Sequence, residues 1–279
     1  MRFHERSIPG RFGAGMTGLP ITISFVKANA CGNDFLIIDA ALAPADIAAF
    51  SRRICDRHTG VGADGVEWLS STAGADIQAR LINADGSEAE ISGNGTRCVA
   101  AYLCSQQLRD KVIIATGAGP KTCTLTSHHD AQYEFEIAMG EPCVEEMLAL
   151  KVRDNPVNGI PVSMGNPHYV VFVNEFVSDW QNLGAAIQHH PYFTQGVNVE
   201  FVNVSDSENI EVRFFERGVG ETQSSGTGSC ASAAATIAGG RAHSPVRVHA
   251  PGGTQTVRWD GQVFLRGPAQ LICSGDFFV

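Results

Sequence analysis

The chain has 279 residues, of which 44% are hydrophobic and 18% charged, and its formal net charge is −9 at pH 7. This length predicts two domains of about 130 residues each, and the composition excludes a disordered chain. The negative charge argues against nucleic acid as a partner, no apolar run approaches the roughly 20 residues of a membrane span, and no secretory segment opens the chain, so we expect a cytoplasmic protein.

The first half of the chain predicts short strands around two helices. Residues 1–19 contain four glycines and little periodicity, so we expect a mobile extension there. Apolar residues at Ile47, Phe50 and Ile54 follow the spacing of one buried helix face. A second helix is expected after Ser92, where a glycine-rich turn precedes an apolar stretch. Runs of β-branched and aromatic residues predict strands at residues 21–26, 36–39, 112–115 and 133–138.

The second half predicts the same succession of elements. The stretch from Glu141 to Asn155 is the expected boundary, which divides the chain into domains at residues 20–144 and 145–279. Residues 268–279 are a candidate to return to the first domain. A helix of mostly small residues is expected to follow Ser225 and to stop at Gly239. Another helical stripe is predicted at Trp180, Leu183 and Ile187, and strands at residues 197–204 and 210–215.

An internal repeat relates the two halves. At a constant offset of 133 residues, Gly32-Asn33 lines up with Gly165-Asn166, and Ser92-Gly93 with Ser225-Gly226. The same shift carries the first helical stripe onto the one that begins at Trp180. Three matches at one offset indicate two homologous domains, with a ligand cleft expected between them.

Neither a metal nor a nucleotide cofactor is indicated. The eight cysteines are dispersed without a Cys-x-x-Cys pair, so reduced and mostly buried thiols are expected. No His-Glu-x-x-His set is present. The glycine-rich stretch at residues 60–65 does not directly follow a buried strand, which argues against a dinucleotide-binding loop. We therefore expect no cofactor and no metal.

Each Ser-Gly-x-Gly turn opens a helix and offers free backbone N–H groups at the positive end of the helix dipole. Such helix ends bind carboxylates and phosphates. For one isolated turn, glycines that only shape the chain are the simpler explanation. The duplication of the turn favours one anion site built from both halves.

These motifs resemble those of the diaminopimelate epimerase family. Its two signatures are similar to Asn-Ala-Asp-Gly-Ser at residues 83–87 with Gly-Asn-Gly at 93–95, and to the segment 216–222 with Gly-Thr-Gly at 226–228. Four further motifs follow the family's order, at residues 32–35, 62–65, 164–168 and 198–201. The resemblance implies an α/β (α+β) fold of two pseudosymmetric domains, each a curled sheet around a central helix. It also implies a cofactor-independent epimerase that interconverts LL- and meso-diaminopimelate for lysine and peptidoglycan-precursor synthesis, and a homodimer.

The chain departs from the family at the two cysteines that carry its proton transfer. Ser92 and Ser225 stand at those positions. A thiol at a helix N-terminus ionises near neutral pH, whereas an alcohol is far less acidic and should move the α-proton poorly. Cys98 and Cys230 lie further along the two helices and are expected to be buried. We therefore expect an inactive or impaired enzyme.

The two serines leave several explanations open. A deliberate double change from cysteine to serine would keep the shape of the site and stop turnover. A natural relative of hydroxyproline epimerases or dehydratases would have altered chemistry. A non-catalytic homologue would keep the site for binding an amino acid.

The resemblance assigns roles to individual positions. It implies that Ser92, Ser225, His168 and Glu216 are the catalytic set, with the last two taking protons from the residues at the cysteine positions. A distal carboxylate of the substrate would need a cation, and Arg217 meets that need. The implied substrate contacts are Asn33, Asn83, Gly93, Asn94, Asn166, Asn198, Arg217, Gly226 and Thr227.

Overall fold

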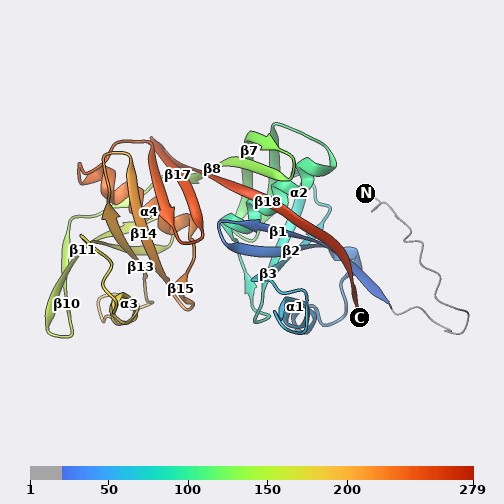
Figure 1. Ribbon diagram of the computed structural model, residues 1–279, viewed down its shortest axis with the longest axis horizontal. Helices are drawn as coiled ribbons and strands as arrows, with labels where there is room; N and C mark the ends of the chain where they lie inside the picture. The colour runs from blue at the N-terminus through green and yellow to red at the C-terminus, as the bar shows by residue number, and fades with distance from the viewer. Residues whose placement is uncertain (1–20) are drawn as a thin grey trace, which may run out of the picture.

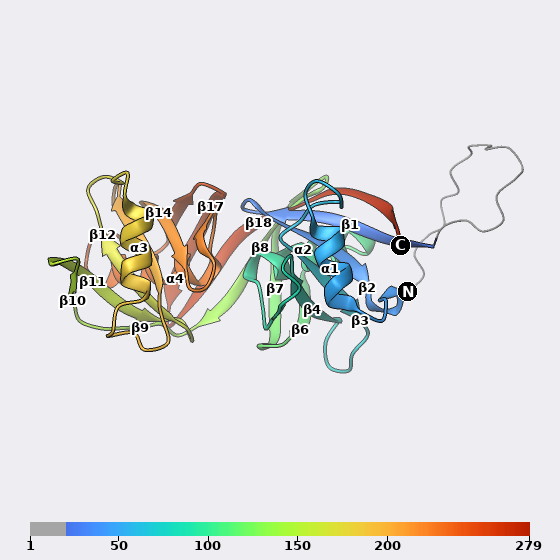
Figure 2. The ribbon, with the colours of Figure 1, turned by 90° about the horizontal axis from the view of Figure 1, so that it is seen from below.

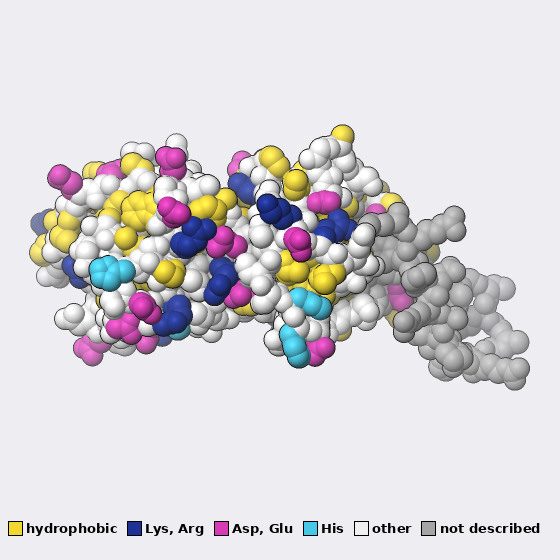
Figure 3. Space-filling view, turned by 90° about the horizontal axis from the view of Figure 1, so that it is seen from above, with side chains coloured by type: hydrophobic (Ala, Val, Ile, Leu, Met, Phe, Trp, Pro, Cys, Tyr) yellow, Lys and Arg dark blue, Asp and Glu magenta, His cyan; other side chains and the backbone are white. Residues whose placement is uncertain are grey.

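The computed structural model describes residues 21–279, so the expected mobile extension at 1–19 lies outside the described residues. The chain forms two lobes side by side along the long axis of the molecule (Figures 1 and 2). Among the described residues, no helix is both long and apolar enough to span a membrane. On the face shown in Figure 3, acidic and basic side chains are intermixed and no extended basic patch is visible.

The first lobe is a curled sheet around helix α2, with helix α1 packed on its outside (Figure 2). Its helices are α1 (Ile47–Cys55), α2 (Gly93–Gln106) and the short 3₁₀ helix η1 (Ala40–Leu42). Its strands are β1 (Thr22–Ala30), β2 (Asn33–Asp39), β3 (Gly65–Ser70), β4 (Ile77–Asn83), β5 (Glu88–Ala89), β6 (Lys111–Thr116), β7 (Gly119–His129) and β8 (Gln132–Gly140).

The second lobe has the same plan around helix α4. Its helices are α3 (Trp180–Gln188) and α4 (Gly226–Ala238). Its strands are β9 (Cys143–Val144), β10 (Leu148–Val152), β11 (Asn155–Ser163), β12 (Pro167–Phe172), β13 (Asn198–Val204), β14 (Asn209–Glu216), β15 (Gly220–Thr222), β16 (Val246–Ala250) and β17 (Gly253–Asp260). The small side chains of α4 are buried from Gly228 to Thr236, because only small residues let the surrounding strands approach this closely. The expected α/β fold with two related domains is confirmed.

The repeat extends to the register of the strands. Strands β2 and β3 are parallel, with Ile37 opposite Glu67, and β12 and β13 are parallel, with Val170 opposite Glu200. Each residue of the second pair lies 133 positions after its counterpart in the first pair. The two lobes therefore hold equivalent residues in equivalent places, and a side chain in one lobe can be compared with its counterpart in the other.

Two long strands, β18 (Gln262–Phe278) and β8, join the lobes. Strand β18 pairs with β17 at its start, with β8 in its middle and with β1 at its end (Figure 1). The stretch from Glu141 to Asn155, expected as a boundary, contains β9 and β10, and both strands pair with β11 of the second lobe. The chain thus enters the second sheet directly after β8.

Candidate active site

The N-termini of α2 and α4 meet between the lobes. Ser92 caps α2 by accepting a hydrogen bond from the Gly95 N–H at 3.1 Å, and Ser225 caps α4 by accepting one from the Gly228 N–H at 3.2 Å. A Cβ on Gly226 would lie only 4.0 Å from the Cα of Gly93. The free N–H groups and positive dipole ends of two helices therefore converge, an arrangement suited to one carboxylate.

The tip of α2 is held by a polar network that crosses to the other lobe. The Asn94 amide donates to the Ser224 hydroxyl at 2.8 Å and to the Asn33 amide oxygen at 3.4 Å. Arg97, which is fully buried, donates to the Asn94 amide oxygen at 2.5 Å and to the Pro268 carbonyl of β18. This network fixes the orientation of Asn94, whose backbone N–H belongs to the candidate anion site.

Glu216 lies on the Ser225 side of the site. It ends β14 and accepts a hydrogen bond from the Thr222 hydroxyl at 2.7 Å. Burial raises the pKa of the Glu216 carboxyl, while the hydroxyls of Thr222 and Ser225 and the nearby His168 favour its charged form. A carboxyl in contact with the Ser225 hydroxyl can accept a proton from it.

His168 belongs to the same cluster and is 1% exposed. Its Nδ1 lies 2.7 Å from Glu200 and its Nε2 lies 3.0 Å from the Asn166 amide oxygen. The Asn166 amide also donates to the Thr227 hydroxyl at 3.4 Å. Two partners on the ring nitrogens fix the plane of the imidazole, as is common for histidines that handle protons.

Arg217 is exposed at the turn that follows β14 and forms no ion pair with any described residue. Its backbone N–H donates to the Asn198 amide oxygen at 2.9 Å, and its guanidinium donates to the Gln195 carbonyl at 3.2 Å. Asn198 also donates to the Pro167 carbonyl at 2.9 Å, so its amide links β13, β12 and the arginine turn. The guanidinium keeps donors free for a carboxylate.

The two remaining predicted contacts have partners of their own. Asn83 ends β4 and donates to the Ser87 hydroxyl at 3.0 Å, within its own turn. Asn33 donates to Asp64 at 2.5 Å, and it meets the predicted set through Asn94. Among the described residues, no hydrogen bond joins Asn83 to another predicted site residue.

Several buried residues near the site were missed by sequence reasoning. Glu67 and Glu200, on β3 and β13, lie against the first turns of α2 and α4, and a Cβ on Gly95 would collide with Oε1 of Glu67. The sequence could have indicated both residues, because Glu67 and Glu200 are separated by the repeat offset of 133 residues and each interrupts an apolar strand. Arg97 gave no such signal.

The cysteines in the two central helices are far less acidic than free thiols. Cys98 and Cys230 are both 0% exposed, and burial raises the pKa of each thiol. As expected, they are buried residues of the helix interior. Among residues 21–279, no three His, Cys, Asp or Glu side chains form a cluster that could hold a metal ion.

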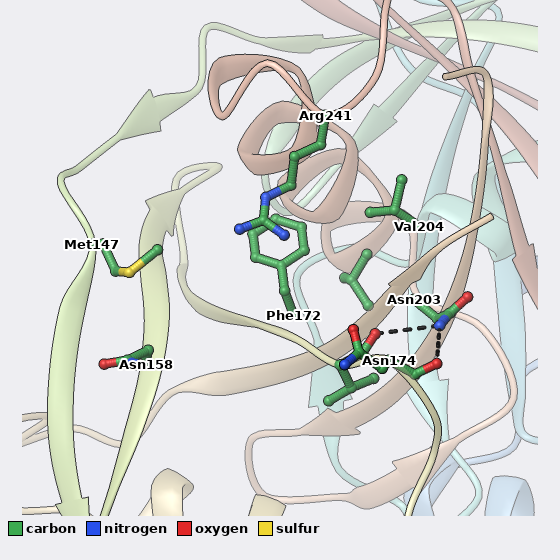
Figure 4. Close-up of a pocket in the computed structure, with 9 residues that line it drawn as sticks. Met147, Asn158, Phe172, Asn174, Asn203, Val204 and Arg241 are labelled. Carbon is green, nitrogen blue, oxygen red and sulfur yellow. Dashed lines mark hydrogen bonds between the residues drawn. The ribbon is translucent and has the colours of Figure 1, made fainter. Parts of the chain in front are cut away.

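Two cavities in the described part of the chain lie outside this junction and have other linings. One, of about 560 Å³, lies in the second lobe, where the Arg241 guanidinium stacks 4.2 Å above the Phe172 ring (Figure 4). The other, of about 420 Å³, has Cys31 and Gly252 among its lining residues. Neither lining includes a predicted site residue, so the converging helix tips remain the candidate site.

Known proteins resemble this chain along most of its length. A family model described as diaminopimelate epimerase matches residues 25–144 and 160–272. A curated diaminopimelate epimerase from Desulfitobacterium hafniense is 36% identical over 275 residues, covering 91% of this chain and 97% of the relative. One from Halothermothrix orenii is 37% identical over 282 residues, covering 92% and 98%.

Solved structures with low sequence identity share the fold. A PhzF-family phenazine biosynthesis protein from Bacillus anthracis has a TM-score of 0.70 at 15% identity and covers 93% of this chain and 100% of its own. A hydroxyproline epimerase from Agrobacterium vitis, with bound trans-4-hydroxy-L-proline, has a TM-score of 0.68 at 15% identity, with coverages of 92% and 93%.

Proposed function

Because the chain belongs to the diaminopimelate epimerase family, we propose that it binds diaminopimelate between its lobes and interconverts the LL and meso forms. The reaction moves a proton off one face of an α-carbon and returns a proton to the other face. Side chains at the two helix tips perform both transfers.

The observation that carries this proposal is the meeting of the α2 and α4 N-termini. The substrate α-carboxylate binds the backbone N–H groups of Gly93, Asn94, Gly226 and Thr227. Two helix dipoles then stabilise the charge that develops when the α-proton leaves, since an enolate-like carboxylate is more negative than the ground state. The close approach of the tips, where a Cβ on Gly226 would lie 4.0 Å from the Cα of Gly93, supports a single shared anion rather than two separate ones.

The distal amino-carboxylate of the substrate binds Arg217. Its exposed guanidinium, without an ion-pair partner among the described residues, can receive a carboxylate in a bidentate manner. The amides of Asn33, Asn83, Asn166 and Asn198 complete the polar lining. Hydroxyproline has no second carboxylate, so this arginine favours diaminopimelate.

The two serines make this proton transfer slow. A serine that takes the α-proton must give up its own hydroxyl proton in the same step, because a free alkoxide is too basic to persist. Glu216 accepts that proton from Ser225, while Ser92 delivers its hydroxyl proton to the opposite face of the α-carbon and takes a replacement proton from solvent in the same step, so that neither oxygen becomes a free alkoxide. His168, whose ring nitrogens contact Glu200 and Asn166, is the second member of the proton-transfer network on the Ser225 side. A cysteine needs no such concerted help, since its thiolate forms near neutral pH at a helix N-terminus.

Deuterium incorporation at the substrate α-carbon in heavy water tests the proposal. We expect little or no exchange with the chain as it stands. The double variant Ser92→Cys/Ser225→Cys should exchange the α-hydrogen at least 100-fold faster, because both transfers then use thiols. The matched control is Ser71→Cys, an exposed position just after β3 and outside the site, which should leave the rate unchanged.

A second candidate function is amino-acid binding without turnover, which the absence of a thiol at both helix tips favours. The Ser92→Cys/Ser225→Cys variant distinguishes between epimerase activity and binding alone. If it binds diaminopimelate but exchanges no deuterium, the chain is a binder. If it binds hydroxyproline in preference to diaminopimelate, the substrate class is wrong.

Family membership supports a place in lysine and peptidoglycan-precursor synthesis, and we propose that the protein works in the cytoplasm as a homodimer. Sedimentation equilibrium measures the oligomeric state. A monomer at micromolar concentration would contradict the dimer and leave the chemistry above unaffected.

A further inference from the structure

One buried carboxyl beside the site has no part in the proposed chemistry. Glu67 on β3 is 3% exposed, and its side-chain carboxyl forms no hydrogen bond or ion pair with any described residue. Its Oε1 lies so close to Gly95 that a Cβ there would collide with it, and the same point lies 3.3 Å from the Ser92 Cβ. Glu67 therefore lies against the first turn of α2, beside the residue that caps it.

The other lobe contains the same arrangement with one difference. Glu200 is the counterpart of Glu67 in the repeat, and its Oε1 would lie 2.9 Å from a Cβ on Gly228 in the first turn of α4. There His168 contacts the carboxyl at 2.7 Å. The position equivalent to His168 in the first lobe is Phe35, so Glu67 has no cation beside it.

A negative charge at this place would oppose an anion bound to the same helix end. We propose that Glu67 is a positioning residue that controls the affinity of the α2 tip for the substrate carboxylate, which binds while Glu67 is protonated and is repelled once Glu67 ionises. This inference rests on the proposed function for the identity of the substrate. It gives the two lobes different means of limiting a buried negative charge: protonation at Glu67 and a histidine partner at Glu200.

The surroundings of Glu67 favour ionisation of its carboxyl within a pH range in which binding can be measured. Burial raises the pKa of the Glu67 carboxyl to about 8. Its strand neighbours Ile37 on β2 and Leu81 on β4 are apolar. The nearby titratable group on α2 is the Cys98 thiol. The charges of Glu67, of Arg97 on the same helix and of Asp34 on β2 all influence its pKa. Burial raises the pKa of that thiol, so it stays neutral through the range that matters.

The experiment measures the dissociation constant of meso-diaminopimelate by calorimetry between pH 6 and 9. We expect the affinity of the unmodified chain to fall about tenfold across this range, with a midpoint near 8. The isosteric variant Glu67→Gln cannot ionise and should lose this step. Titration of the substrate amines affects both proteins equally, so the difference between them isolates Glu67. The control Glu211→Gln removes an exposed carboxylate on β14 and should keep the step.

Binding of inorganic sulfate provides a second test that does not depend on the identity of the substrate. Its affinity, measured by the rise in melting temperature, should show the same Glu67-dependent step, because sulfate needs only the helix ends. If diaminopimelate does not bind but sulfate shows the step, the proposed function fails and the role of Glu67 stands. If neither ligand shows a step that Glu67→Gln removes, the inference is wrong, whatever the substrate is.

Discussion

Arg97 shows how much of the site depends on one residue with no direct role in the chemistry. It is a fully buried cation without a carboxylate partner among the described residues, and it bonds instead to the carbonyls of Gly93 and Pro268 and to the Asn94 amide. A charge in this position is tolerated because its hydrogen bonds are directed at fixed acceptors. Arg97 thus joins the tip of α2 to β18.

Arg217 offers a test of substrate recognition at a single side chain. Replacing it with Met should weaken binding of diaminopimelate by roughly tenfold to 100-fold, since a charge-assisted hydrogen bond contributes about 1.5–3 kcal/mol. Binding of L-lysine, which lacks the distal carboxylate, should be unchanged. Calorimetric titration measures both constants, and Arg241→Met is the matched control. Equal losses for both ligands would refute the assignment of Arg217 to the distal carboxylate.

The raised pKa of Glu67 also affects stability. The folded chain holds a proton on Glu67 up to about pH 8, whereas the unfolded chain releases it near 4.5. Between these values the folded state binds more protons, so the free energy of unfolding falls as pH rises, by up to about 1.4 kcal/mol per pH unit. Urea unfolding of Glu67→Gln between pH 5 and 8 should show a shallower decline than the unmodified chain. Parallel declines would mean that Glu67 ionises normally in the folded state.

At the scale of elements, strong local signals could be read from the sequence. The predicted helices form at α1, α2, α3 and α4, because each has an apolar face or a run of small residues. Ser92 and Ser225 cap their helices, as the Ser-Gly turns indicate. Residues 268–279 were a candidate to return to the first domain, but the strands that β18 pairs with and the register of that pairing were out of reach, because no local pattern specifies them. The ring contacts of His168 likewise depend on β13 lying beside β12.

The first turn of α2 requires glycine at one position and not at another. Gly95→Ala should lower the free energy of unfolding by about 1–3 kcal/mol, because its Cβ meets the buried Glu67 carboxyl. Gly93→Ala should leave stability unchanged or slightly higher, since a Cβ there meets nothing within 4 Å and alanine favours a helix. Urea unfolding compares the two variants. Equal effects would show that the first turn yields easily and that Glu67 does not press on it.

At the scale of the whole molecule, the lobes touch through backbone as well as side chains. A Cβ on Gly252, in the turn between β16 and β17, would collide with the Cys31 carbonyl in the turn between β1 and β2. Only glycine permits this approach. The contact lies between the two sheets and helps to hold the helix tips together.

Gly252→Ala should therefore separate the lobes. We expect a larger radius of gyration by small-angle X-ray scattering and weaker binding of diaminopimelate, because the two helix ends no longer meet at one carboxylate. Gln262→Ala is the control, since it only shortens an exposed side chain at the start of β18 and changes no glycine turn. The variant protein should scatter differently from the control; identical curves together with unchanged binding would show that another contact sets the distance between the lobes.

Strand β18 has a consequence for how the molecule loses its structure. The first residues of β18 pair with β17 in the second lobe, and its last residues pair with β1 in the first lobe. Unfolding of either lobe therefore removes hydrogen bonds from the strand that the other lobe needs. Two lobes of this size joined by a loose tether would denature in separate steps. Calorimetry of this chain should instead record a single heat-absorption peak, so that damage to either half is felt as a loss of the whole.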